Sequence, residues 1–243
     1  MDDLNHMHKN KQRSLLLLLL LITLSVGTYN LIQYTNSHKY ETVEITQFQG
    51  IYFNSPHPML LLDEAFVLQD FSPYVLLAGP GQTGAHLIME KLEEQFGTFN
   101  GKRIRLQGTL RKGDGTLVGE LSQGVDALIA IEGSLTYPIQ QTAPKPIELV
   151  GEVVNAKCWL SWATPRMGWM HRYCTKKSLT QGVPPILRVV QDERNVIYLV
   201  EGKNSHELFA KHAGNELELK GEVYYQNGWN VLRLSDESQA AIK

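Results

Sequence analysis

The sequence predicts a mainly β fold, in which an N-terminal transmembrane helix precedes two OB-like Greek-key β-barrels, each with a short helix. Three observations predict this class. A leucine-rich, uncharged stretch follows a basic N-terminus, and short apolar runs separated by turn residues recur through the rest of the chain. Two segments with helical spacing interrupt these runs at matching places. The length of 243 residues and the hydrophobic content of 43% allow a substantial core.

The N-terminal segment predicts a membrane anchor. Basic residues within positions 1–13 precede an uncharged stretch at 14–34, and a helix needs roughly 20 apolar residues to cross a bilayer. The basic flank places the N-terminus in the cytoplasm and the body of the protein outside it. A cleaved signal peptide is the alternative, because the densest apolar part is only Leu15–Val26.

The remaining residues show the pattern of short β-strands. Strands are expected at Ile45–Phe53, Tyr74–Ala78, Arg103–Leu110, Thr116–Leu121, Ile147–Val154, Ile186–Val190, Val196–Val200, Leu217–Tyr225 and Trp229–Leu234. Residues 84–97 and 204–214 instead carry apolar side chains at helical spacing and end at a glycine. Strands at this density are typical of a sandwich or a barrel.

The order of strand, helix and hairpin occurs twice, which indicates an internal repeat. Placing Gly108 over Gly221 aligns Asp114–Gly115 with Asn227–Gly228 without a gap. Asp-Gly and Asn-Gly favour type I′ hairpin turns, because both central residues need positive φ. We therefore expect the same β-hairpin in both halves.

The repeat predicts two domains. The first OB-like domain is expected at 43–136 and the second at 147–236. The connection at 137–146 contains three prolines, which favour an extended, semi-rigid linker.

A loop at 157–185 of the second domain contains both cysteines of the chain. A disulfide between Cys158 and Cys174 suits an exported domain, needs no cofactor and would contribute about 3 kcal/mol by closing the ring. A metal or haem site would use Cys158, His171 and Cys174, and thiolate with imidazole suits zinc or copper. A distant fourth ligand would come from His57, His86, His206, His212 or a methionine. A reactive thiol activated by nearby basic groups, or two inert thiols, are the other interpretations.

Aromatic residues of the same loop predict a contact surface. Trp159, Trp162 and Trp169 lie close together with Arg166 and Met167 between them, which is more aromatic surface than a small barrel buries. Exposed Trp, Met and Arg are typical of interfaces. We expect these five residues to bind another membrane or periplasmic protein.

No catalytic motif accompanies these residues. The glycine-rich stretch Gly79–His86 lacks the Lys-Ser/Thr pair of a phosphate-binding loop, so a turn and helix cap are expected there. A net charge of −2 without a long basic run argues against nucleic acid as a partner. The sequence favours a non-enzymatic binding or assembly module, such as an accessory subunit of a membrane complex. The alternative is a metal, haem or thiol-redox protein.

Three short strings in this loop resemble a known pattern. Lys157-Cys158, His171-x-x-Cys174 and Gly182-x-Pro-Pro occur in the same order in uncharacterised bacterial membrane-anchored proteins. The resemblance covers residues 157–185 of the 243. It implies bacterial export and a shared loop, but no activity. We therefore expect a single-pass protein of the bacterial inner membrane with its body in the periplasm.

Overall fold

A computed structural model gives the structure of the chain. It describes residues 15–29, 42–43, 47–67, 69, 71–112, 116–133, 138–160, 166–235 and 241–242. The chain contains two compact units, residues 1–39 and 40–243, and each is described by itself.

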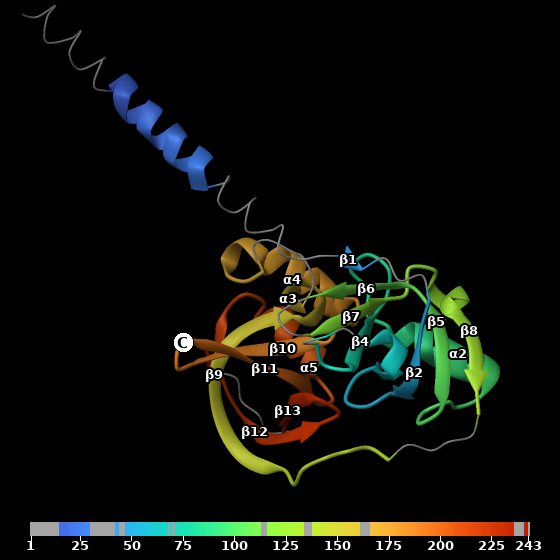
Figure 1. The fold of residues 1–243 in the computed structure, drawn as a ribbon. Helices are drawn as coiled ribbons and strands as arrows, with labels where there is room; N and C mark the ends of the chain where they lie inside the picture. The colour runs from blue at the N-terminus through green and yellow to red at the C-terminus, as the bar shows by residue number, and fades with distance from the viewer. Residues whose placement is uncertain are drawn as a thin grey trace, which may run out of the picture. The chain divides into compact units, whose positions relative to one another are not determined.

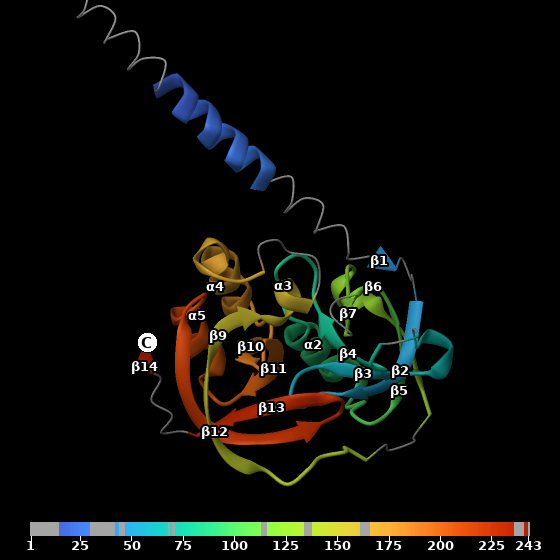
Figure 2. The same ribbon diagram turned by 60° about the vertical axis from the view of Figure 1, so that its left-hand side comes forward.

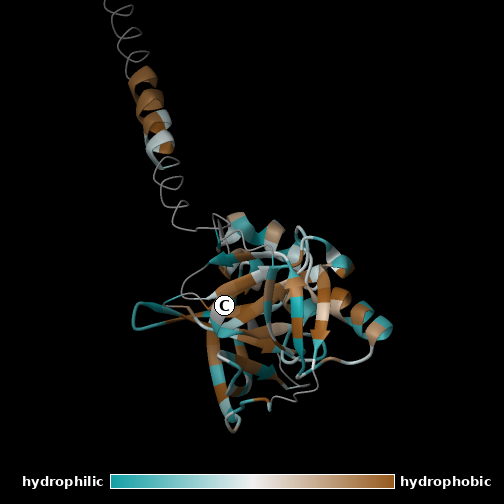
Figure 3. Ribbon diagram, turned by 45° about the vertical axis from the view of Figure 1, so that its right-hand side comes forward, coloured by the Kyte–Doolittle hydropathy of each residue, from teal (hydrophilic) through white to brown (hydrophobic). Residues whose placement is uncertain are grey.

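The first unit contains a helix at residues 15–29. Its leucines are exposed, and Figure 3 shows the hydrophobic colour along most of its length. Within the part of the chain that the structure describes, no helix is both long enough and apolar enough to cross a membrane. Ser14 and residues 30–34 of the predicted anchor lie outside the described residues, so the anchor stays a prediction.

The second half of the chain forms a closed five-stranded barrel (Figures 1 and 2). Its strands are β9 (Lys145–Asn155), β10 (Pro185–Gln191), β11 (Arg194–Glu201), β12 (Glu216–Gln226) and β13 (Trp229–Leu234). Neighbouring strands pair antiparallel in the order β11, β10, β9, β12, β13. A parallel pairing of β11 with β13 closes the ring. The helix α5 (Ser205–Lys211) connects β11 to β12, and the short β14 (Ala241–Ile242) pairs with β12.

The first half forms an eight-stranded sheet in the order β1-β6-β7-β4-β3-β2-β5-β8. These strands are β1 (Thr42–Val43), β2 (Gln47–Phe53), β3 (Met59–Leu62), β4 (Tyr74–Ala78), β5 (Arg103–Gln107), β6 (Thr109–Lys112), β7 (Leu117–Glu120) and β8 (Leu128–Glu132). The helix α2 (His86–Phe96) connects β4 to β5, and short 3₁₀ helices occupy η1 (Glu64–Phe66) and η2 (Gly124–Ala127). The expected strand at 103–110 is interrupted at Gly108, where the chain changes from pairing with β2 to pairing with β7.

Two glycines mark equivalent positions in the halves. The β6–β7 and β12–β13 ladders have the register that the alignment of Gly108 with Gly221 predicts. A Cβ atom on Gly108 would lie 2.3 Å from the carbonyl oxygen of Glu120, and one on Gly221 would lie 2.3 Å from that of Arg233. Each glycine is therefore required by the close approach of the neighbouring strand.

The local predictions for the second hairpin are confirmed. Asn227 and Gly228 have φ values of 48° and 82°, as a type I′ turn requires. The expected turn at 114–115 lies outside the described residues. Both expected helices are present, as α2 and α5, whereas β3 and β8 were missed because their runs of apolar residues are short and do not alternate.

Three hydrophobic cores stabilise the second unit. One lies within the first half and one within the second. The third, here called the seam core, joins the halves. Its buried residues are Ile51, Phe53, Met59, Leu76, Ala78 and Val118 from the first half, and Val154, Ala156, Trp159, Leu160, Val183, Ile186, Leu199, Tyr224, Trp229 and Val231 from the second. Because the seam is itself a core, the halves pack as one compact body.

Polar contacts reinforce this seam. Nε2 of His57 lies 2.9 Å from the carbonyl oxygen of Val200, and Nε2 of Gln226 donates to the carbonyl oxygen of Ser55 at 2.8 Å. The backbone N–H of Gly84 donates to Gln181 at 3.0 Å. The first two bonds join β11 and β12 to the first half, and the third joins the segment that carries the cysteines to it.

The glycine contacts lead to a stability prediction. We expect Gly221→Ala to lower the free energy of unfolding by about 2–3 kcal/mol, because its Cβ overlaps a backbone carbonyl that has little freedom to move. Gly124→Ala is the matched control, since nothing lies within 4 Å of its Cβ and only its positive φ is strained; it should cost about 1 kcal/mol. Urea denaturation measures both, and equal costs would contradict the packing argument.

Candidate functional site

The candidate site lies where two short helices meet beside β9. α3 (Ala156–Leu160) follows β9 directly and carries Cys158. The 3₁₀ helix η3 (Trp169–His171) ends at His171, and α4 (Arg172–Thr180) carries Cys174 in its first turn. Figures 1 and 2 show α3 and α4 next to each other, and both contact β9. The segment expected to be a loop is thus largely helical, because Thr175, Ser178 and Leu179 give α4 a face that packs inward.

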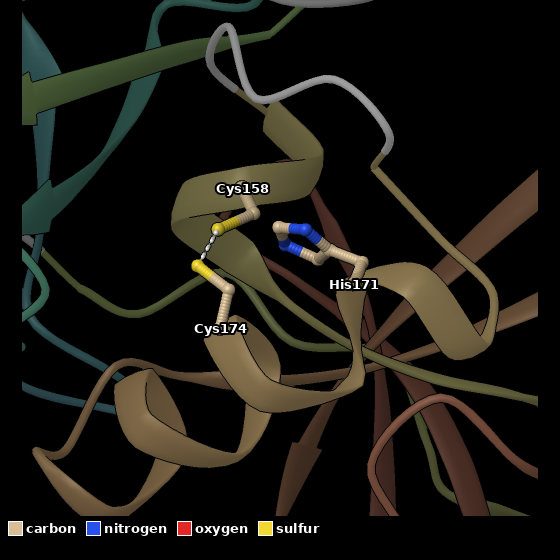
Figure 4. A group of neighbouring side chains, drawn as sticks. All are labelled: Cys158, His171 and Cys174. Carbon is tan, nitrogen blue, oxygen red and sulfur yellow. Dashed lines mark hydrogen bonds between the residues drawn. The ribbon is translucent and has the colours of Figure 1, made fainter.

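The three predicted metal ligands converge. The Sγ atoms of Cys158 and Cys174 lie 3.5 Å apart, and both cysteines are free thiols in the structure. A nitrogen of His171 completes a group whose ligand atoms all lie within 4.8 Å of one another. The side chains point towards one another from α3, η3 and α4 (Figure 4). Cys158 and His171 are 7% and 6% exposed, so these two side chains lie in the interior, whereas Cys174 is half-buried.

A buried asparagine ties the two helices together. Oδ1 of Asn155 accepts a hydrogen bond of 2.8 Å from the backbone N–H of Cys158 and so satisfies a free donor at the start of α3. Nδ2 of the same side chain lies 3.4 Å from Oγ1 of Thr175 on α4. Since Asn155 is fully buried, these bonds are not exposed to competition from water.

A buried lysine ties α3 to the first half. Nζ of Lys157 donates to the carbonyl oxygen of Gly79 at 2.7 Å and lies 3.3 Å from a carboxylate oxygen of Glu120. Glu120 also accepts a 2.8 Å bond from Nε of Arg111. Burial lowers the pKa of Lys157, while the Glu120 carboxylate opposes that change. This network fixes the residue that precedes Cys158.

The electrostatic environment keeps Cys158 protonated in the absence of a cation. Burial raises the pKa of its thiol to about 12, against the opposing hydrogen bond from Asn155 and the charge of Lys157. A thiolate is the nucleophilic form of cysteine. The reactive-thiol interpretation therefore gains no support from the surroundings of Cys158.

His171 is held as a neutral imidazole. Burial lowers its pKa, and the nearby carboxylate of Glu152 partly offsets this effect. Glu152 is itself occupied, because it accepts a 2.9 Å bond from Arg188 and another from the backbone N–H of Gly168. Nε2 of His171 is buried and has no hydrogen-bond partner among the described residues. A neutral ring with an unmet nitrogen is in the state that binds a metal ion.

Gln82 from the first half reaches the same group. Its Nε2 atom donates to Sγ of Cys174 at 3.1 Å, and its Oε1 atom is buried without a partner among the described residues. Gln82 belongs to the glycine-rich stretch that the sequence indicated only as a turn. Its position at the site depends on the seam between the halves, so local sequence gave no signal for it.

The residues predicted to bind a partner divide into two groups. Trp159 is 5% exposed and belongs to the seam core, with the guanidinium groups of Arg166 and Arg188 at 5.2 and 5.7 Å from its ring. This burial argues against direct contact of Trp159 with a partner. Trp169 and Met167 are 81% and 45% exposed.

The remaining members of the predicted surface also differ. Trp162 lies outside the described residues. Arg166 donates a 3.3 Å bond to the carbonyl oxygen of Trp159 and so covers the buried ring. Met170 and Tyr173, which the sequence analysis did not single out, are 63% and 79% exposed beside Trp169. The exposed apolar surface therefore follows η3 and α4 rather than α3.

Comparisons with known proteins do not assign this site. No protein-family model matches the chain, and no match was found among curated proteins or among solved structures.

Substitution by alanine should affect the stability of the protein much more at Trp159 than at Trp169. Trp159→Ala should lower the free energy of unfolding by about 3–5 kcal/mol, because it opens a cavity in the seam core. Trp169→Ala should change it by no more than about 0.5 kcal/mol, because the side chain is exposed. Chemical denaturation of both variants checks this, and a large loss in Trp169→Ala would place that residue in a core instead.

Proposed function

We propose that the protein binds a zinc or cuprous copper ion through Cys158, His171 and Cys174. The observation that carries the proposal is the convergence of these three side chains, two of them more than nine-tenths buried, with all ligand atoms within 4.8 Å. Their soft sulfur and imidazole atoms match the ligand preferences of these two ions.

The distances suit a shared ion. With zinc–sulfur bonds of about 2.3 Å, two thiolates in a tetrahedral site lie roughly 3.8 Å apart, close to the observed 3.5 Å. A bound ion would also supply the positive charge that two neighbouring thiolates need, and it would satisfy the unmet nitrogen of His171. Three protein ligands leave a fourth position for Gln82, water or a transferred ligand.

A disulfide between the same cysteines is the main competitor. The sulfur atoms would have to approach by about 1.5 Å to reach the bond length of about 2.05 Å. Such a bond would contribute loop-closure stability, but it would leave the buried nitrogen of His171 without a partner. The metal interpretation accounts for all three residues, so we place it first. The lining residues of the three described cavities do not include this group, which gives haem no support.

We further propose that both halves are OB-type barrels related by a repeat. In the second half, a helix connects the third and fourth strands, and the third strand pairs parallel with the fifth. In the first half, β4 likewise pairs parallel with β7, and α2 occupies the matching connection. If β5 and β6 are taken as one strand bent at Gly108, the first half has the same ring of pairings.

A second candidate function is suggested by the exposed surface beside the site. Met167, Trp169, Met170 and Tyr173 are all exposed, and such side chains are enriched in protein interfaces. We propose that this surface docks a membrane or periplasmic partner, with the leucine-rich N-terminal segment as anchor. The metal ion would then lie directly behind the docking surface.

The metal proposal is tested by cobalt(II) substitution of the reduced full-length chain in detergent. Thiolate-to-cobalt charge transfer should give strong near-ultraviolet absorption, and zinc should displace the cobalt. Cys158→Ser and Cys174→Ser should each reduce this absorption and weaken zinc binding at least about 100-fold, and His171→Gln should weaken it about as much. His212→Gln is the control, because His212 is equally buried in the same half but is not part of the group.

Two further results would decide between the interpretations. Affinity should rise with pH between 6 and 8, because the Cys158 thiol has to release its proton to the solvent when the ion binds. An intact mass two protons below the reduced value, with no charge-transfer absorption after reduction and cobalt addition, would refute the metal site and leave the disulfide.

A further inference from the structure

A second group of metal-ligating side chains lies elsewhere along the seam. His57 follows β2, His86 begins α2, and His206 lies in α5, so the first half supplies two rings and the second half one. The ring centroids of His57 and His206 are 6.0 Å apart, and those of His86 and His206 are 6.2 Å apart. None of the three belongs to the cysteine group.

Backbone hydrogen bonds orient two of these rings. Nε2 of His57 donates to the carbonyl oxygen of Val200 at 2.9 Å, which leaves Nδ1 with a lone pair. His206 is hydrogen-bonded to the backbone of Gly182, and its Nε2 is buried without a partner among the described residues. Histidines that bind metals commonly donate their other ring N–H to a backbone carbonyl in this way.

The third ring has an unmet nitrogen as well. Nδ1 of His86 is buried, and no described residue bonds to it. Buried polar atoms without partners are rare in folded proteins, because each one costs roughly 1–3 kcal/mol. Two such atoms, Nδ1 of His86 and Nε2 of His206, lie on neighbouring rings. They indicate a metal ion that both nitrogens would bind.

Two glycines at the seam allow His86 to lie close to the second half. A Cβ atom on Gly182 would lie 1.9 Å from Cε1 of His86, and one on Gly84 would lie 1.9 Å from the carbonyl oxygen of Gly182. The close backbone approach therefore brings His86 against the second half. Cavities of about 740 and 420 Å³ are both lined by His86, Gly182 and His206, so an ion has a path to the rings.

We propose that His57, His86 and His206 form a second, sulfur-free site for a divalent ion of the zinc and nickel class. Nitrogen–zinc bonds are about 2.0–2.1 Å long, so the centroids of two rings on one tetrahedral ion lie roughly 5.2 Å apart. The observed separations of 6.0 and 6.2 Å are roughly 1 Å longer than this distance. Binding therefore draws the rings together and ties the first half to the second.

Acidic side chains of the smaller cavity favour a cation there. Glu90, Glu93 and Glu201 line it together with the three histidines, whereas the larger cavity is lined by Glu207 and two lysines. Burial lowers the pKa of His57 to about 4, so its ring is neutral at pH 7 and needs no deprotonation before it binds. The same burial favours neutral His206.

The test uses the full-length Cys158→Ser/Cys174→Ser variant, which has no sulfur ligand at the first site. Calorimetric titration with zinc should show one remaining equivalent per chain. Adding His206→Gln or His57→Gln should weaken this binding at least tenfold, whereas adding His212→Gln should leave it unchanged. Zinc should also raise the melting temperature of the Cys158→Ser/Cys174→Ser variant, because the ion connects the two halves. This increase should be absent when His206→Gln is added.

Cobalt titration of the reduced wild-type chain gives an independent readout if the cysteine variant does not fold. A second cobalt equivalent should bind without adding charge-transfer absorption, and His86→Gln should abolish that equivalent alone. No second equivalent, or one that persists unchanged in His206→Gln and His86→Gln, would overturn the proposal. Because charge transfer reports only the thiolate site, failure of one site is distinguished from failure of the other.

Discussion

Burial of the seam core is the interaction on which the rest of the structure depends. Trp159 packs there with large apolar side chains from both halves, and burying such a side chain contributes several kcal/mol. α3 cannot leave this position without opening a cavity, so Cys158 is fixed relative to the barrel. Leu179 buries the inner face of α4 in the core of the second half, which fixes Cys174 on the opposite side. The site is therefore held by packing on two sides.

Buried polar groups then set the chemistry of this position. Asn155, Lys157 and Glu152 are each less than a tenth exposed, and each has specific partners. Against this background, Nε2 of His171 and Oε1 of Gln82 are buried polar atoms that have no hydrogen-bond partner among the described residues. Cys158 and His171 are enclosed in this way, and the proposed metal ion would bind both of them together with the half-buried Cys174. Trp169 and Tyr173 are exposed and adjoin this group in the chain, and the proposed partner would contact the protein there.

Much of the fold was predictable from sequence, and the site only in part. The alternating runs, the helices at 84–97 and 204–214, and the turn at Asn227–Gly228 are local signals, and the structure contains each of them. The grouping of His171 with both cysteines was predicted as one alternative, because their residue types fit a metal. Gln82 was not predicted, and the histidines of the seam were named only as possible distant ligands of the cysteine site, because these residues come together only when the halves pack. Trp159 was predicted to lie on a surface because a count of tryptophans takes no account of a core between the two halves.

The central claim is that sulfur and imidazole ligands from α3, η3 and α4 share one metal ion. X-ray absorption spectroscopy at the zinc edge tests it most directly, using reduced full-length protein loaded with one equivalent of zinc. The account predicts two sulfur scatterers at about 2.3 Å and nitrogen or oxygen scatterers at about 2.0–2.1 Å. A shell made only of nitrogen and oxygen, or protein that takes up no zinc after reduction, would contradict it.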